Sequence, residues 1–231
     1  MRVQRSFAFT DLSGFTALTE VEGDERAVSV ISAFRTLLRE ICSRRGVRIA
    51  KWLGDGAMLV GVECKPLLAA MLELHYAADR VWTAGDSLAI CTGVAGGEVI
   101  LLEGDDYIGH PVNVAARLSD QAVGGELLAQ WTLVGDLPNW GAALDRSDVA
   151  LRGLEHPMTV ARLGMRPLQG TAVPDPVCRI PLTREVAEVI AVDGLGNEIW
   201  FCSDSCKDTW ERRPPPPSDE LGSLRTPLLE L

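Results

Sequence analysis

The order of the hydrophobic patterns over the first 134 residues limits the possible folds more than any other feature of the chain. Alternating residues at 6–10 predict a strand that ends at Asp11. Helical spacing of apolar residues predicts a helix from Asp24 to about Arg45, where Gly46 stops it. The later patterns predict strands at 47–52 and 57–62, a helix at 66–82, strands at 87–94 and 97–102, a helix at 113–123 and a strand at 126–134.

Two of these predicted strand pairs depend on short turns. The Leu-Gly-Asp-Gly sequence between 47–52 and 57–62 is typical of a hairpin, and a second strand pair is predicted around Gly96 and Gly97. The order strand, helix, strand, strand, helix, strand is the split βαβ pattern of a ferredoxin-like domain. We therefore expect an α+β fold in which an antiparallel sheet carries its helices on one face.

Changes in composition predict the domain organisation of the 231-residue chain. We expect a main domain over 1–165, a linker over 166–174 and a cysteine-containing module over 175–214. Four consecutive prolines begin at Pro214 and cannot form a helix, so the tail over 215–231 should be disordered.

Charge and hydropathy exclude several classes of protein. A formal net charge of -10 without a long basic run argues against a nucleic-acid-binding protein. No apolar stretch approaches the length of about 18 residues that a membrane helix needs, and the short apolar run near the N-terminus is not a signal peptide. We therefore expect a cytoplasmic protein without a membrane partner, whose six cysteines are reduced.

Two aspartates should meet at one edge of the predicted sheet. Asp11 ends the first strand and Asp55 lies in the hairpin between the second and third strands, which places both beside each other in a split βαβ sheet. Carboxylates together with phosphate oxygens are the ligands that Mg²⁺ prefers. The alternative is that both aspartates only cap turns.

The residues after Asp11 suit phosphate binding. Gly14 allows the backbone of a Leu-Ser-Gly-Phe-Thr loop to approach a ligand closely, and successive N–H groups at a helix start can hold a phosphate. Lys51 can face the same ligand from the edge of its strand, although an ordinary solvent-facing lysine is the alternative.

A third group of polar residues lies further along the chain. Asn113 and Arg117 are four residues apart and share one helical face, where an amide and a guanidinium can stabilise charge on a phosphoryl group. Asp106 precedes them. The alternative is a capping asparagine and a surface arginine.

Four segments containing these residues resemble the catalytic domain of class III adenylate and guanylate cyclases. They occur in the order and at the spacing of that family, and the resemblance covers about residues 5–165; the segments are Phe9–Thr16, Lys51–Gly56, Gly93–Val99 and Asp106–Leu118. A later segment, Val149–Leu154, resembles the closing strand of the family.

The resemblance implies a role for each matching residue. Asp11, Asp55 and the backbone of Leu12 would hold two Mg²⁺ or Mn²⁺ ions, and the loop residues Gly14, Phe15 and Thr16 would bind the triphosphate.

The same resemblance implies how a nucleotide is read. Lys51 and Asp106 match the pair that reads the purine, in the combination that resembles adenylate cyclases. Asn113 would orient the ribose, Arg117 would stabilise the transition state and Arg152 would bind the triphosphate.

The family's active site is shared between two catalytic domains. The resemblance therefore implies a homodimer that converts ATP into cyclic AMP and pyrophosphate at two shared sites. The alternative function is a regulatory module that binds nucleotide with little turnover, or a metal- or redox-responsive sensor.

The C-terminal module contains three cysteines that can gather at one place. Cys202 and Cys206 are four residues apart and can share a helical face, and Cys178 follows an Asp-Pro-Val sequence. Three thiolates suit Zn²⁺, whereas buried packed thiols are the alternative. The segment resembles the YHS family of small cysteine-containing domains, with Arg179-Ile180 in place of the usual Gly-Met.

Overall fold

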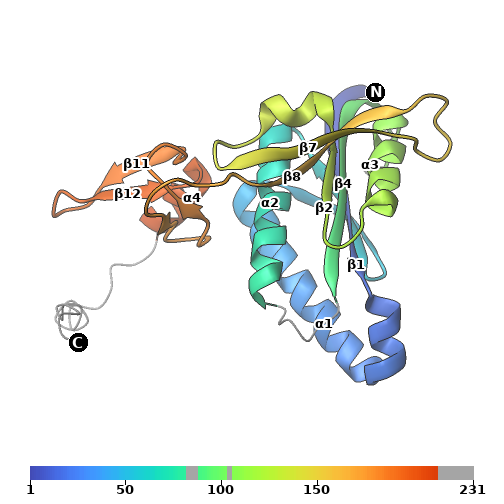
Figure 1. Cartoon of the computed structure of the whole chain (residues 1–231), viewed down its shortest axis with the longest axis horizontal. Coiled ribbons are helices and arrows are strands. Elements are labelled where there is room, and N and C mark those ends of the chain that lie inside the picture. The colour runs from blue at the N-terminus through green and yellow to red at the C-terminus, as the bar shows by residue number, and fades with distance from the viewer. Residues whose placement is uncertain (82–87, 103–105, 213–231) are drawn as a thin grey trace.

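Strand β1 (Arg2–Ser13) lies near the middle of the main sheet and pairs along both of its edges. A computed structural model describes residues 1–81, 88–102 and 106–212 (Figure 1). The sheet order is β2-β3-β1-β4-β6-β8-β7, and the short β5 pairs with β4. The other strands are β2 (Arg48–Leu53), β3 (Gly56–Gly61), β4 (Ala89–Leu101), β5 (Tyr107–Ile108), β6 (Leu127–Gln130), β7 (Gly141–Val149) and β8 (Met158–Met165).

The α+β fold is confirmed, and two details of the predicted sheet are corrected. Helices α1 (Phe15–Arg45) and α2 (Cys64–Val81) cover the sheet face that carries Ala8. Helix α3 (His110–Gln121) packs on the opposite face, against Phe7, so the helices do not share one face. The second detail is the pairing of β4 with β6, which is parallel because α3 forms the crossover between them.

The predicted strand pair around Gly96 and Gly97 is wrong, because β4 runs through both glycines as one strand of 13 residues. It pairs with the whole of β1, from Arg2 opposite Ile100 to Ser13 opposite Ala89. The glycines of β4 instead allow α3 to approach closely. A Cβ on Gly97 would lie 2.8 Å from the Pro111 ring.

Three other predicted boundaries also differ. Helix α1 starts nine residues before the expected Asp24 and passes a non-helical Gly23 with φ of 83°. Its first turns carry few buried residues, so they show little apolar periodicity. Helix α3 starts at His110, and the strand expected over 126–134 ends at Gln130, where the 3₁₀ helix η2 (Trp131–Asp136) begins. Parts of the segments predicted over 66–82 and 87–94 lie outside the described residues.

A small second unit follows β8 and packs beside α1 and α2 (Figure 1). It consists of two two-stranded sheets and one helix: β9 (Val173–Pro174), β10 (Pro181–Leu182), β11 (Val189–Val192), β12 (Glu198–Phe201) and α4 (Asp204–Glu211). The tail predicted to be disordered lies outside the described residues. Among the residues described, no helix combines the length and the apolar character that a membrane crossing needs.

A buried polar chain links α2 to β1. His75 Nδ1 donates to the Gly125 carbonyl over 3.0 Å, and its Nε2 lies 2.9 Å from the Thr92 hydroxyl oxygen. The Thr92 hydroxyl donates in turn to the hydroxyl of Thr10, the residue before Asp11. Burial lowers the pKa of His75 to about 4, because it disfavours the charged imidazolium.

We predict that His75 makes the protein less stable as the pH falls. Between pH 6.5 and about 4 the unfolded chain binds the proton that the folded chain does not, so stability is lost across this window. The shift corresponds to roughly 3 kcal/mol. Urea unfolding of the wild-type protein at several pH values should show this loss of stability. A His75→Gln variant should not show it, whereas a control variant at an exposed histidine, His156→Gln, should show the same loss as the wild type. An identical pH dependence in both variants would contradict the prediction.

Candidate functional site

The two predicted metal-binding aspartates come together at the end of β1. Thr10 pairs with Ala57 of β3, so the β2–β3 turn that holds Asp55 lies beside Asp11. Gly56 makes this approach possible, because a Cβ there would lie 2.6 Å from the Thr10 carbonyl oxygen and 2.8 Å from Asp11 Oδ1. The structure thus brings the two aspartates together, as the order of the strands predicts.

Asp11, one member of the acid pair, faces an open cleft. Asp11 lines a cleft of about 440 Å³ together with Ser13, Gly56 and, from α3, Ser119 and Asp120. Partial burial raises the pKa of Asp11, and the nearby carboxylate of Asp55 raises it further. Such carboxylates repel each other until a cation neutralises them, which is the electrostatic character of a divalent metal site.

An arginine of α1 holds the turn that carries Asp55. Arg35 Nη2 donates to the Gly54 carbonyl over 2.9 Å, and its guanidinium lies 5.0 Å from the centre of the Trp52 ring. Arg39 stacks on the same ring at 5.1 Å. Gly54 adopts a φ of 68°, which favours glycine, so the tight turn and its tether to α1 fix the position of Asp55.

Lys51 and Asp106 form a second group within the chain. Lys51 Nζ lies 2.7 Å from Asp106 Oδ1, and both side chains are about half exposed. The hydrogen bond from Lys51 lowers the pKa of Asp106. Neither residue lines the cleft beside Asp11.

The remaining predicted residues lie at three places, and all but the buried Leu12 are at least partly exposed. Asn113 and Arg117 share the exposed face of α3, where Arg117 Nη1 pairs with Asp120 at 3.0 Å. Arg152 is exposed in the connection between β7 and β8. The loop residues Leu12, Gly14, Phe15 and Thr16 lie at the end of β1 and the start of α1, where Gly14 has a φ of 88°.

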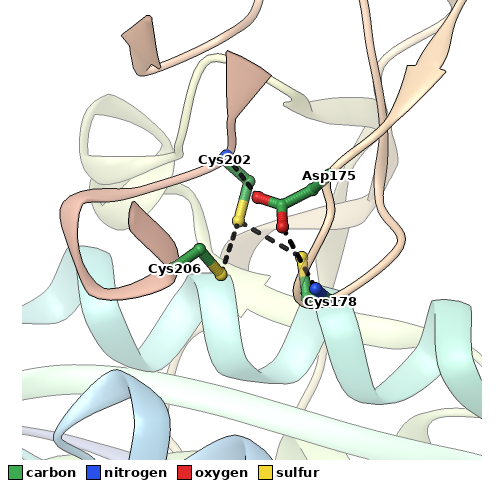
Figure 2. Close-up of side chains that lie close together, drawn as sticks. All are labelled: Asp175, Cys178, Cys202 and Cys206. Carbon is green, nitrogen blue, oxygen red and sulfur yellow. Dashed lines mark hydrogen bonds between the residues drawn. The ribbon is translucent and has the colours of Figure 1, made fainter. Parts of the chain in front are cut away.

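The three cysteines of the second unit form a compact cluster (Figure 2). Cys178 lies in the turn between β9 and β10, Cys202 follows β12 and Cys206 lies in α4. Cys202 Sγ lies 3.4 Å from Cys178 Sγ and 3.5 Å from Cys206 Sγ. A tetrahedral zinc site with Zn–S bonds of about 2.3 Å has an S···S edge of about 3.8 Å, so a small expansion would admit the ion.

Sequence reasoning missed the fourth member of this cluster, Asp175. Its carboxylate lies with the three thiols inside a group whose ligand atoms are all within 4.8 Å of one another. Oδ1 accepts from the backbone N–H groups of Val177 and Cys178, and Oδ2 accepts from that of Cys202 (Figure 2). The Asp-Pro dipeptide three residues before Cys178 was the available signal, because aspartate often bonds to the backbone two or three residues later.

The thiols share their protons unequally. Hydrogen bonds from the thiols of Cys178 and Cys202 lower the pKa of Cys206 to about 4, whereas hydrogen bonds to the other two thiols raise the pKa of Cys178. Burial raises the pKa of Asp175. The cluster thus stabilises a thiolate, which is the form of cysteine that binds metals.

Relatives of known sequence match between 49% and 74% of this chain. An uncharacterised protein of Mycobacterium tuberculosis is 33% identical over 159 residues, which are 69% of this chain and 41% of that protein. A pH-sensitive adenylate cyclase of the same species is 32% identical over 180 residues, 74% of this chain and 44% of the relative. An adenylate cyclase of Streptomyces coelicolor is 30% identical over 128 residues, which are 49% of this chain and 29% of that protein. This chain therefore spans less than half the length of these relatives, and no family model matches it.

Solved structures agree with the architecture. The adenylyl cyclase CyaB from P. aeruginosa superposes with a TM-score of 0.61 at 22% identity, covering 73% of this chain and 96% of that one. The guanylyl cyclase Cya2 superposes with a TM-score of 0.63 at 21% identity, covering 72% of this chain and 94% of that one. The first domain has the class III cyclase fold. Because adenylyl and guanylyl cyclases match alike, the fold does not distinguish between the two substrates.

We predict that Arg35→Ala loosens the β2–β3 turn of this cyclase fold. A hydrogen bond from a charged donor contributes about 1.5–3 kcal/mol, so amide hydrogen exchange at residues 53–56 should become about ten times faster or more. Arg39→Ala is the matched control, because Arg39 stacks on Trp52 while Arg35 also bonds to Gly54. Equal exchange rates in the two variants would show that the bond to Gly54 does not hold the turn.

Proposed function

We propose that residues 1–165 form an adenylate cyclase, which converts ATP into 3′,5′-cyclic AMP and pyrophosphate. The observation that carries the proposal is the pairing of Asp11 with Asp55 at adjoining ends of β1 and the β2–β3 turn, on a class III cyclase fold. Two relatives named as adenylate cyclases support the same activity. A cytoplasmic location belongs to the proposal, since ATP and reduced cysteines occur together there.

Asp11 and Asp55 suit a pair of divalent cations. They offer oxygen ligands beside an open cleft, and the backbone of Leu12 follows directly. Bound Mg²⁺ or Mn²⁺ would supply positive charge that acidifies the ribose hydroxyl and stabilises the leaving pyrophosphate. Gly14, Phe15 and Thr16, at the start of α1, would direct N–H groups at the triphosphate.

Lys51 and Asp106 would select adenine. Adenine presents an acceptor at N1 and a donor at its 6-amino group, which a lysine and an aspartate complement. Guanine presents a donor at N1 and an acceptor at O6. Lys51 would then face another donor and Asp106 another acceptor, so guanine would be disfavoured. The 2.7 Å pair between them supports this assignment, because it holds a donor and an acceptor side by side at an accessible position.

The proposed active site requires a second copy of the chain. Asp11 lines the cleft and Asp55 lies in the turn beside it, whereas Lys51 and Asp106 pair with each other away from its lining, and Asn113 and Arg117 are exposed on α3. In a two-fold dimer the acids of one copy would meet the other four residues of the second copy, which makes two equivalent sites.

In the proposed reaction the ribose 3′-hydroxyl gives its proton to water, and its oxygen bonds to the α-phosphorus. The bond from that phosphorus to the oxygen bridging the β-phosphorus breaks, and pyrophosphate leaves with the electron pair. Asn113 would orient the ribose, Arg117 would exchange its bond to Asp120 for one to the charged phosphoryl group, and Arg152 would hold the triphosphate.

The purified protein is expected to form cyclic AMP from ATP with Mg²⁺ or Mn²⁺, and much less cyclic GMP from GTP. Asp55→Ala should lower turnover by about 100-fold or more, the scale of losing one group that stabilises the transition state. Asp24→Ala, an exposed acid of α1, is the control. Nucleotide binding without product would instead favour a regulatory module of the same fold.

Mixing two inactive variants tests the shared site. Asp55→Ala and Arg117→Ala each inactivate both sites of a homodimer. A heterodimer of the two variants has one site with both changes and one intact site, so an equal mixture should recover about a quarter of the wild-type activity. Recovery should fall on dilution. A mixture that stays inactive although the chains exchange would rule out sites built from two copies.

We also infer that the YHS-like module, residues 175–214, binds a thiophilic divalent cation such as Zn²⁺. Cys178, Cys202 and Cys206 would be its ligands, supported by their S···S distances of 3.4 and 3.5 Å. Asp175 already accepts three backbone hydrogen bonds, so it would orient the thiols from outside the metal's own ligands.

A further inference from the structure

Arg45, the last residue of α1, reaches out of the cyclase domain into the thiol cluster. Its side chain is only 2% exposed. Nη2 lies 3.2 Å from Cys202 Sγ and Nη1 lies 3.4 Å from the Ser203 hydroxyl. On its other side, Nε donates to Glu73 of α2 over 2.6 Å. The guanidinium therefore lies between a buried carboxylate of the cyclase domain and a buried thiol of the module.

A tryptophan of the cyclase domain holds the same cysteine by its backbone. Trp140, which follows η2 and is fully buried, donates from Nε1 to the Cys202 carbonyl over 3.0 Å. Arg45 lies over its ring at 5.4 Å from the centroid. Both the sulfur and the carbonyl of Cys202 are thus bonded by side chains that belong to the other domain.

The chemistry of this contact requires an electron-rich sulfur. A guanidinium has donors and no acceptor, so Cys202 Sγ can only accept from Arg45. Three thiolates around a divalent cation carry one net negative charge, which a buried guanidinium balances. Hydrogen bonds to ligand atoms from outside the ligand shell commonly orient the ligands and strengthen metal binding.

We propose that Arg45 couples metal binding by the three cysteines to docking of the module on the cyclase domain. The proposal rests on the inferred metal site and not on nucleotide turnover. With the metal bound, the anionic centre holds Arg45 and the C-terminal end of α1 against the module. Without it, the three sulfur atoms together carry less negative charge and hold the guanidinium less strongly, so the contact between the domains loosens.

The position of α1 gives this contact its consequence. The helix begins directly after Gly14, beside Asp11, and its last residue Arg45 precedes the strand β2 that carries Lys51. Arg35, which holds the turn of Asp55, lies on the same helix. The metal-dependent contact thus acts on the element that supports both groups of the proposed nucleotide site.

The test measures zinc binding and hydrogen exchange on the full chain, after removal of metal with a chelator. Adding Zn²⁺ to the wild-type protein should fill one site and slow exchange together in residues 38–47 and 199–211. Arg45→Lys keeps the charge and loses the forked donor geometry; it should bind Zn²⁺ about 10–100-fold more weakly and lose the slowing in 38–47.

Two further variants separate folding effects from coupling. Arg45→Met combined with Glu73→Gln removes both of these buried charges together. Arg44 also loses Glu73 as a partner, but its side chain is partly exposed. This double variant should bind Zn²⁺ without protecting 38–47. Arg184→Lys, an exposed arginine within the module, is the matched control and should behave as wild type.

Each outcome decides a different point. Failure of the wild-type protein to bind Zn²⁺ would overturn the metal site and the coupling with it. Zinc binding that leaves exchange in 38–47 unchanged, or that Arg45→Lys neither weakens nor uncouples, would overturn the coupling alone. Neither result depends on whether the first domain makes cyclic nucleotide.

Discussion

The pairing of β1 along both edges is the constraint on which the rest of the structure depends. Its contacts with β3 and β4 place the end of the strand, and with it Asp11, beside the turn that carries Asp55. The two faces of β1 also separate the two cores, because Ala8 packs under α1 and α2 while Phe7 packs under α3. Strand geometry, with alternate side chains on opposite faces, is sufficient to explain both effects.

Helix α1 extends this constraint to the second domain. After the kink at Gly23, residues 24–45 span about 33 Å at 1.5 Å per residue and end with Arg45 at the thiol cluster. Buried ion pairs from Arg44 and Arg45 to Glu73 join its end to α2. Removing one partner of such a buried pair would leave an uncompensated charge, so these residues fix the helix ends in position more than they add stability.

Local patterns were sufficient where the structure depends on local chemistry. The Leu-Gly-Asp-Gly turn and the approach of Cys202 to Cys206 follow from short spacings in the sequence, and the order of the strands brings Asp11 beside Asp55. Gly97 could not be interpreted in this way, because its role depends on Pro111 of a helix that packs against the strand. Arg45 was missed for a similar reason, because its partner Cys202 is distant in sequence. Asp175 was missed although two of its three partners are local.

The two proposed sites differ in where their charges lie. Lys51 and Asp106 are half exposed and pair with each other, so a ligand can replace that bond at little cost in desolvation. Arg45, Glu73 and Asp175 are buried and fully engaged. Buried, bonded groups keep one geometry, whereas exposed pairs can exchange partners. The first site is therefore built to bind and release a substrate, and the second to hold its ligands in place.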